Sequence, residues 1–177
     1  MRKVIYYVAS SIDGYISGPD DDVSGYVQTG NGVEKYLGDL AGFDTVIMGR
    51  KTYEYGYAFG IEPGQPAYPN MTHYIFSDTL TFDHPHESVH VKPLNLDAID
   101  AIKQQPGTDI YLCGGGQLAG WLLDHQRIDL LRIKLSPVVL GQGIRLFGDS
   151  TKAYKAGLID TEAYEHGLQM MTFAITY

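Results

Sequence analysis

Short apolar runs recur along the chain and alternate with polar or glycine-rich segments. Residues 4–10 and 45–48 are almost continuously apolar and rich in β-branched side chains, which is typical of strands buried on both faces. Similar runs predict further strands at 73–76, around Val89 and Val91, and at 109–113 and 128–135. The hydrophobic pattern therefore predicts six strands distributed over most of the chain.

Helical spacing of apolar residues separates several of these predicted strands. One helix is expected to start at Asn31, to run through Glu34, Leu37 and Leu40, and to end at Gly42. A second carries Leu96, Ile99 and Ile102 and stops at Pro106–Gly107, and a third runs through Leu118, Trp121 and Leu122. Residues 50–54 are expected to form a short helix, whereas 13–32 and 56–70 are expected to be long loops.

Strands that alternate with helices favour a mainly parallel sheet with right-handed crossovers. The segment from about 154 to 177 contains two extended stretches with Gly167 between them, which predicts an antiparallel hairpin. The fold class is therefore α/β. We expect one domain over residues 1–177, with three α/β/α layers and a mainly parallel mixed sheet that ends in this hairpin.

Composition and charge narrow the classes of partner. The 177 residues carry a net charge of −8, which repels phosphate backbones and anionic lipid, so neither nucleic acid nor a membrane is an expected partner. No apolar run is long enough to span a bilayer. The single cysteine, Cys113, rules out an internal disulfide and fits a reducing compartment, so a cytoplasmic location is expected. His84, His86 and His90 have a spacing found in metal sites but no Cys or carboxylate partner at a fixed spacing, so no metal site is expected.

Gly114, Gly115 and Gly116 stand where a predicted strand meets a predicted helix. Glycines at such a join let a ligand approach the backbone, and the free N–H groups and dipole of the helix N-terminus favour a pyrophosphate. A tight turn, in which glycine only relieves crowding, is the competing interpretation. The triplet alone favours the two interpretations about equally.

The segment Met48–Glu54 has the same strand-to-helix position and adds Arg50, Lys51 and Thr52. Arginine grips phosphate with two parallel hydrogen bonds, and threonine adds a third. Cations at a helix N-terminus oppose the helix dipole unless an anion lies between them. The alternative is that both basic side chains point into water.

These two segments resemble the cofactor segments of dihydrofolate reductases. Two others, residues 10–16 and 136–147, are similar to the reductase domain of the bifunctional deaminase-reductase of riboflavin synthesis. The four matches fall in the right order and cover nearly the whole chain. The chain is therefore identified as a member of the dihydrofolate-reductase-like superfamily, closest to that reductase domain.

The resemblance implies a nicotinamide cofactor and assigns residues to it. NADPH is expected, because Arg50 and Lys51 can hold its additional phosphate. NADH is the alternative, because Asp78 stands where the family often has a basic residue that helps hold the phosphate of NADPH. The implied cofactor-binding residues are Gly49, Arg50, Lys51, Thr52, Ser77, Gly114, Gly115, Gly116 and Gln117.

The resemblance also implies a substrate cleft near the opening motif. Ser11, Gly14 and Tyr15 are the expected substrate-binding residues, and Asp13 and Glu34 are the candidate catalytic carboxylates. Each carboxylate also has an ordinary structural interpretation. Asp13 could be a turn residue before Gly14, and Glu34 could be a solvent-exposed residue of a helix.

Three functions remain open from the sequence. The first is an NADPH-dependent reductase of a small pteridine- or pyrimidine-type heterocycle. The second is the riboflavin-pathway reductase itself, whose substrate carries a ribose phosphate that the carboxylates of residues 20–22 would repel. The third is a nucleotide-binding protein without turnover. A homodimer is also expected, because Met170, Met171 and Phe173 place apolar side chains on what would be a sheet edge.

Overall fold

The computed structural model describes residues 1–177 and contains one large sheet. Its strands are β1 (Val4–Ser10), β3 (Thr45–Gly49), β4 (Thr72–Phe76), β5 (Val89–Lys92), β6 (Ile110–Gly114), β7 (Leu130–Leu135), β9 (Lys155–Ala163) and β10 (Gln169–Thr176). They lie in the order β5-β4-β3-β6-β1-β7-β10-β9. β10 pairs antiparallel with β7 and β9, and the remaining pairs are parallel. The predicted mixed sheet with a C-terminal hairpin is confirmed.

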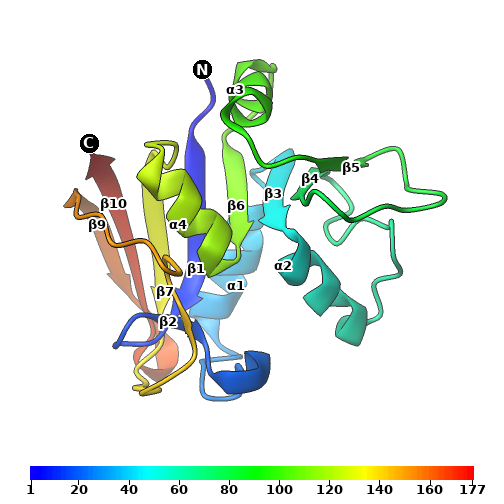
Figure 1. Ribbon diagram of the computed structural model, residues 1–177. Helices are drawn as coiled ribbons and strands as arrows, with labels where there is room; N and C mark the ends of the chain where they lie inside the picture. The colour runs from blue at the N-terminus through cyan, green and yellow to red at the C-terminus, as the bar shows by residue number, and fades with distance from the viewer.

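Helices cover both faces of this sheet, which gives the three layers (Figure 1). α4 (Gly116–Asp124) lies in front of the sheet in Figure 1 and α1 (Asn31–Leu40) lies behind it. α3 (Leu96–Gln104) packs into the same apolar cluster as α4, through Ile99 and Ile102. The short α2 (Arg50–Tyr55) follows β3 directly, so its first residues stand at the carboxyl edge of the sheet.

The core has two halves, one on each side of the sheet. Tyr6 belongs to the cluster beneath α3 and α4, whereas Tyr7 belongs to the cluster beneath α1, as the two-residue period of a strand requires. Both rings are fully buried, and each hydroxyl finds an acceptor: Tyr6 donates to the carbonyl of Leu146 at 3.0 Å and Tyr7 to Asp39 at 3.0 Å. Burial of a large apolar side chain contributes about 1.5–3 kcal/mol, so alternate residues of β1 stabilise both layers.

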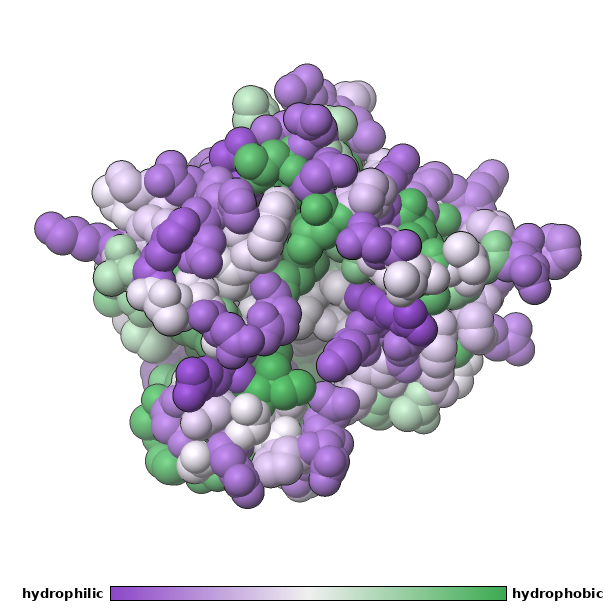
Figure 2. Space-filling view, in the orientation of Figure 1, coloured by the Kyte–Doolittle hydropathy of each residue, from purple (hydrophilic) through white to green (hydrophobic).

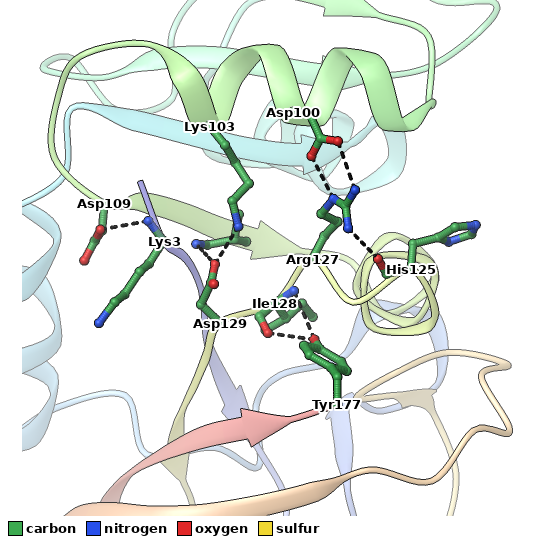
Figure 3. Close-up of polar contacts among 10 residues, drawn as sticks. Lys3, Asp100, Lys103, Asp109, His125, Arg127, Ile128, Asp129 and Tyr177 are labelled. Carbon is green, nitrogen blue, oxygen red and sulfur yellow. Dashed lines mark hydrogen bonds and ion pairs between the residues drawn. The ribbon is translucent and has the colours of Figure 1, made fainter. Parts of the chain in front are cut away.

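Ion pairs stabilise the edge of the sheet at which the parallel strands begin (Figure 3). Arg127 makes two hydrogen bonds to Asp100 of α3, at 2.7 and 2.9 Å. Lys103 of α3 pairs with Asp129 at 2.8 Å, and Asp129 also accepts the backbone N–H of Val4 at 2.7 Å. These contacts tie α3 to the starts of β1 and β7, and they leave the carboxyl edge free for other segments.

Some details differ from the sequence-based expectation. β7 begins at Leu130 rather than at residue 128, and a two-stranded ribbon of β2 (Tyr15–Ser17) and β8 (Ile144–Arg145) was not expected. Met170, Met171 and Phe173 do not form a sheet edge, because β10 lies between β7 and β9. The edge strand is β9, which is exposed along its whole length. None of the helices has the length and apolar character needed to cross a bilayer.

Candidate functional site

A cavity of about 1130 Å³ opens at the carboxyl ends of β1, β3, β4 and β6. Figure 2 shows apolar residues in a hollow at the centre of this face, between hydrophilic rims. Pockets for small ligands usually enclose about 300–1,000 Å³, so the space suits an extended ligand. Most of the polar lining comes from residues 49–52, 115–117, 143–145 and 148–150.

The two glycine turns meet in this cavity because β3 and β6 are neighbours in the sheet. Met48 pairs with Gly114, so the residues that follow each strand lie side by side. A Cβ atom on Gly49 would lie 4.0 Å from the backbone nitrogen of Gly115. A Cβ atom on Gly115 would lie 3.0 Å from Oγ1 of Thr52. The absence of side chains at both positions keeps a backbone-lined cradle open between the starts of α2 and α4.

Gly115 is the N-cap of α4 and supplies no side chain to the free N–H groups of the first turn. Those groups remain available to an anion, and the helix dipole adds to their attraction. Gly114 lies beneath the turn with φ +128°, a conformation that glycine adopts without strain, and the Gly114–Gly115 peptide bond is cis. Gly114 itself is buried and does not line the cavity, whereas Gly115, Gly116 and Gln117 do.

Basic side chains gather at the α2 side of the cavity. Nε of Arg50 lies 2.7 Å from Glu54, one turn further along α2, and the Arg50 guanidinium also donates to Thr79 at 3.0 Å. Lys51 is exposed in the lining. Asp21, Asp124 and Asp149 contribute carboxylates elsewhere, and Gln117 donates to Asp149 at 2.7 Å. Arg145 adds a third cation on the wall formed by residues 143–150, so cations and carboxylates both line the cavity.

A third wall comes from the segment 143–150, which packs against the start of α4 backbone to backbone. A Cβ atom on Gly116 would lie 2.2 Å from the carbonyl oxygen of Arg145, and one on Gly120 would lie 2.2 Å from that of Phe147. Both glycines are thus required by a close approach of two chain segments. The sequence motif at 136–147 was recognised, but its role as a cavity wall was not.

Ser77 follows β4 directly but is used in a turn. Its hydroxyl accepts the backbone N–H groups of Thr79 at 3.2 Å and Leu80 at 3.0 Å. The cavity is lined at this point by Phe76 and Leu94 instead of Ser77. Ser77 therefore shapes the end of the cavity from just outside its lining.

Residues of the opening motif are held by a set of hydrogen bonds outside the cavity lining; we call this set, centred on Asp13, the clasp. The carboxylate of Asp13 accepts hydrogen bonds from the hydroxyl of Ser11 at 2.7 Å and from the N–H groups of Leu140 at 3.1 Å and Gly141 at 2.7 Å. The hydrogen bond from Ser11, with those from the two amides, lowers the pKa of Asp13 to about 2. Asp13 is therefore ionised at neutral pH, and it holds the loop at Leu140 and Gly141 in place.

The neighbours of Asp13 take part in the same clasp. The hydroxyl of Ser11 accepts the N–H of Tyr15 at 2.9 Å, and the carbonyl of Gly14 accepts the N–H of Leu146 at 2.9 Å. The hydroxyl of Tyr15 points to the carbonyl of Gly141 at 3.4 Å. None of Ser11, Asp13, Gly14 and Tyr15 lines the cavity, which the same motif and β2 reach through Ile16 and Ser17. Their role in binding the substrate stays a prediction.

Glu34 also lies away from the cavity. It is exposed on α1 and is not among the lining residues. This exposure agrees with the alternative stated for Glu34, an exposed helical glutamate, and the buried residues of α1 are Gly32 and Leu40. The predicted helix is confirmed as α1, whereas the catalytic role of Glu34 stays a prediction.

Several lining residues were not identified from the sequence. They are apolar or aromatic residues at strand ends and on helices, where a core role is the ordinary interpretation. For Val8, Ala9, Phe76 and Cys113 the nearest signal was a position at the end of a predicted strand. They include Val8, Ala9, Phe76, Leu94, Cys113 and Trp121.

Comparison with known proteins agrees with this architecture. The family described as RibD C-terminal domain matches residues 2–170. The uncharacterized protein YwjB of Bacillus subtilis is 31% identical over 175 residues, covering 96% of each chain. A putative riboflavin biosynthesis protein from Shewanella sp. PV-4 superposes with a TM-score of 0.83 at 22% identity and covers all of both chains. Dihydrofolate reductase from Enterococcus faecalis, solved with NADP(H), superposes with a TM-score of 0.64 at 16% identity, covering 99% of this chain and 97% of that one.

Proposed function

Since the chain belongs to the RibD C-terminal domain family, we propose that it is a reductase that uses NADPH, with NADH as the alternative reductant. Its substrate would be a small pteridine- or pyrimidine-type heterocycle that accepts hydride. The observation that carries this proposal is the meeting of two glycine turns, one of them beside Arg50 and Lys51, in one large cavity. Dinucleotides typically lie across the carboxyl ends of parallel strands, which is where this cavity opens.

The residues present fit a dinucleotide. The cradle at Gly49 and Gly115 would be filled by a side chain, and it lies against the free N–H groups that begin α4. Thr52, Arg50 and Lys51 would hold phosphate groups, and Gln117 would lie at the same end. A bound reduced nicotinamide would supply the hydride, while the protein orients it and the acceptor.

The remaining lining serves to exclude water from the reacting groups. Val8 and Ala9 at the end of β1 and Trp121 of α4 present apolar atoms to the cavity. A dry wall strengthens the electrostatic contacts made nearby and limits loss of the hydride to solvent.

The proposal is tested by binding and turnover together. Calorimetry with NADPH and NADH measures whether the cavity takes either dinucleotide. Loss of reduced-nicotinamide absorbance, measured against folates, pterins and pyrimidine ribosylamines, measures hydride transfer. Binding of NADPH without oxidation by any acceptor would favour the alternative of a nucleotide-binding protein without turnover. Failure of both dinucleotides to bind would refute the proposal.

Replacing Arg50 by alanine is expected to weaken NADPH binding by about tenfold and NADH binding by much less. A charge-assisted hydrogen bond to a phosphate contributes about 1.5–3 kcal/mol, and NADH lacks the ribose phosphate. Glu54→Gln serves as the companion variant, because it frees Arg50 from its ion pair and should strengthen NADPH binding slightly. Equal losses for both dinucleotides in calorimetry would show that Arg50 does not contact the ribose phosphate.

The riboflavin-pathway reductase is the second candidate function, and the family match favours it. Its substrate carries a phosphate, whereas Asp21 is one of the cavity-lining residues and places a carboxylate there. Unit charges about 8 Å apart interact by roughly 2 kcal/mol at an effective dielectric of about 20. We therefore expect the dephosphorylated pyrimidine to be preferred, and Asp21→Asn to improve kcat/KM for the phosphorylated form several-fold.

Asp20→Asn is the matched control for that experiment, because Asp20 is the adjacent exposed carboxylate outside the lining. Steady-state kinetics on both forms of the pyrimidine provide the measurement. A parent enzyme that prefers the phosphorylated form, with no gain in the Asp21 variant, would instead support the riboflavin-pathway assignment.

A homodimer formed through β9 is a further part of the proposal. β9 is an edge strand, and its Leu158 and Ile159 are 55% and 59% exposed. Exposed apolar edges of this length tend to be covered in native proteins. Light scattering is expected to give a dimer mass for the parent and a monomer mass for a Leu158→Lys, Ile159→Lys variant. A monomer mass for the parent at high concentration would reject the dimer.

A further inference from the structure

One buried hydroxyl on the cavity wall has no hydrogen-bond partner in the protein. Ser17, in β2, is 6% exposed and lines the cavity, yet its Oγ atom is shielded from solvent and makes no hydrogen bond. It is the only buried polar side-chain atom of the chain in this state. A buried hydroxyl without a partner destabilises a protein, and such groups are rare in native structures.

The other buried serines near the carboxyl end of β1 are all paired. Ser10 donates to the carbonyl of Ser11 at 2.9 Å, and Ser11 donates to Asp13 at 2.7 Å. The hydroxyl of Ser136 accepts the backbone N–H of Val27 at 3.1 Å. None of these three serines lines the cavity. The missing partner is therefore confined to the one buried serine that the cavity reaches.

The other side chains on this wall do not share the problem. Asp21 and Arg145 also line the cavity, but both residues are exposed, so water satisfies their polar atoms. Ile16 and Ile144, the neighbours of Ser17 in the two-stranded ribbon of β2 and β8, are apolar. A ligand that fills the cavity is thus the remaining source of a partner for the Ser17 hydroxyl.

The ribbon of β2 and β8 holds the main chain of Ser17 in place. Ser17 pairs with Ile144, and a Cβ atom on Gly143 would lie 2.0 Å from the carbonyl oxygen of Ser17. Gly143 has φ +141°, so glycine is needed there both for its conformation and for this close approach. The backbone is therefore fixed, whereas the hydroxyl can turn toward the cavity by rotation about the Cα–Cβ bond.

The topology places Ser17 at the far end of the cavity from Arg50. β3, β6 and β1 are neighbours in that order, α2 follows β3, and β2 follows β1. Figure 1 shows α2 and β2 on opposite sides of the start of α4. A dinucleotide with its ribose phosphate at Arg50 and its pyrophosphate at the cradle of Gly49 and Gly115 would extend over the end of β1. The part that reaches Ser17 is then its nicotinamide half.

We propose that the hydroxyl of Ser17 hydrogen-bonds the nicotinamide half of the bound dinucleotide and orients the reacting ring over the end of β1. The ribose hydroxyls and the ring carboxamide of that half both offer donors and acceptors to a serine. This inference rests on the proposed reductase function and adds a binding residue to its site. It also explains the unpaired hydroxyl, because the free protein is destabilised by a group that the ligand pairs on binding.

Ser17→Ala tests the proposal through binding and stability together. Calorimetry is expected to show about fivefold weaker binding of both NADPH and NADH, the effect of one lost neutral hydrogen bond. Binding of 2′,5′-ADP, which lacks the nicotinamide half, should be unchanged. Arg50→Ala should give the converse pattern, with losses for NADPH and 2′,5′-ADP. The melting temperature of ligand-free Ser17→Ala should rise by about 2–4 °C, because alanine removes the unpaired hydroxyl.

Ser136→Ala is the matched control, because Ser136 is also buried but its hydroxyl is paired and lies outside the cavity lining. It should leave both dinucleotide affinities unchanged and lower the melting temperature. Unchanged affinity for NADPH and NADH in Ser17→Ala, an equal loss for 2′,5′-ADP, or a lower melting temperature would each overturn the role of Ser17 alone. Failure of the parent protein to bind either dinucleotide would overturn the proposed function, and this inference with it.

Discussion

Replacing Gly116 by alanine is expected to destabilise the protein by about 3 kcal/mol, although alanine favours helices over glycine. Gly116 is the first residue of α4, and an added Cβ atom would lie 2.2 Å from the carbonyl oxygen of Arg145. The obstacle is backbone, so the 143–148 segment must move. Because that segment forms a wall of the cavity, NADPH affinity should fall at least tenfold as well.

Gly38→Ala is the matched control for this substitution. Gly38 lies within α1, and a Cβ atom there would meet nothing within 4 Å. Alanine should therefore raise the free energy of unfolding by up to about 1 kcal/mol at that position. Urea unfolding and calorimetry measure both effects. If both variants gained stability, the tight packing of α4 against residues 143–148 would not exist in solution.

Acidification from pH 6.5 to about 4 is expected to remove up to about 3 kcal/mol of stability through His73 alone. His73 is fully buried, its Nε2 accepts the N–H of Tyr68 at 3.1 Å, and its Nδ1 lies 3.0 Å from the carbonyl of Met71. The neutral ring satisfies both contacts, whereas a proton on Nε2 would face another donor. Burial is the main cause that lowers the pKa of His73 to about 4.

The sign follows from proton uptake. Between pH 6.5 and 4 the unfolded chain binds a proton at this histidine and the folded chain does not, so acid favours unfolding. Carboxylates titrate at the lower end of the same range, so the effect must be isolated with His73→Gln, which does not titrate. The urea-derived free energy of unfolding of the variant should depend on pH less steeply than that of the parent. Identical slopes for the two proteins would contradict a neutral buried His73.

The fold was largely predictable because its signals are local. The continuous apolar run at residues 4–10 can only be a strand covered on both faces, and the structure confirms it as β1 in the centre of the sheet. The position of Gly167 between two extended stretches likewise predicted the final hairpin. The ribbon of β2 and β8 was missed, because its two strands are three and two residues long and pair across more than half the sequence.

The site was predictable only where glycine and charge mark it. Gly49 and Gly115 stand at strand-to-helix joins, and the pairing of β3 with β6 in the structure brings them together. Asp13 illustrates the limit: its motif was recognised, but the amides of Leu140 and Gly141 that hold its carboxylate are far away in sequence.

The central position of β1 has a consequence for how the chain acquires its structure. Val4 pairs with Ile110 on one side, and Ile5 pairs with Leu130 on the other, so both partners of the first strand are made long after it. During synthesis, the apolar segment that forms β1 therefore stays unpaired until most of the chain has been synthesised. Sheets with such distant pairings fold slowly, and their unpaired, aggregation-prone strand edges stay exposed during folding. This protein should therefore depend on chaperones or low temperature for high yield more than its size alone implies.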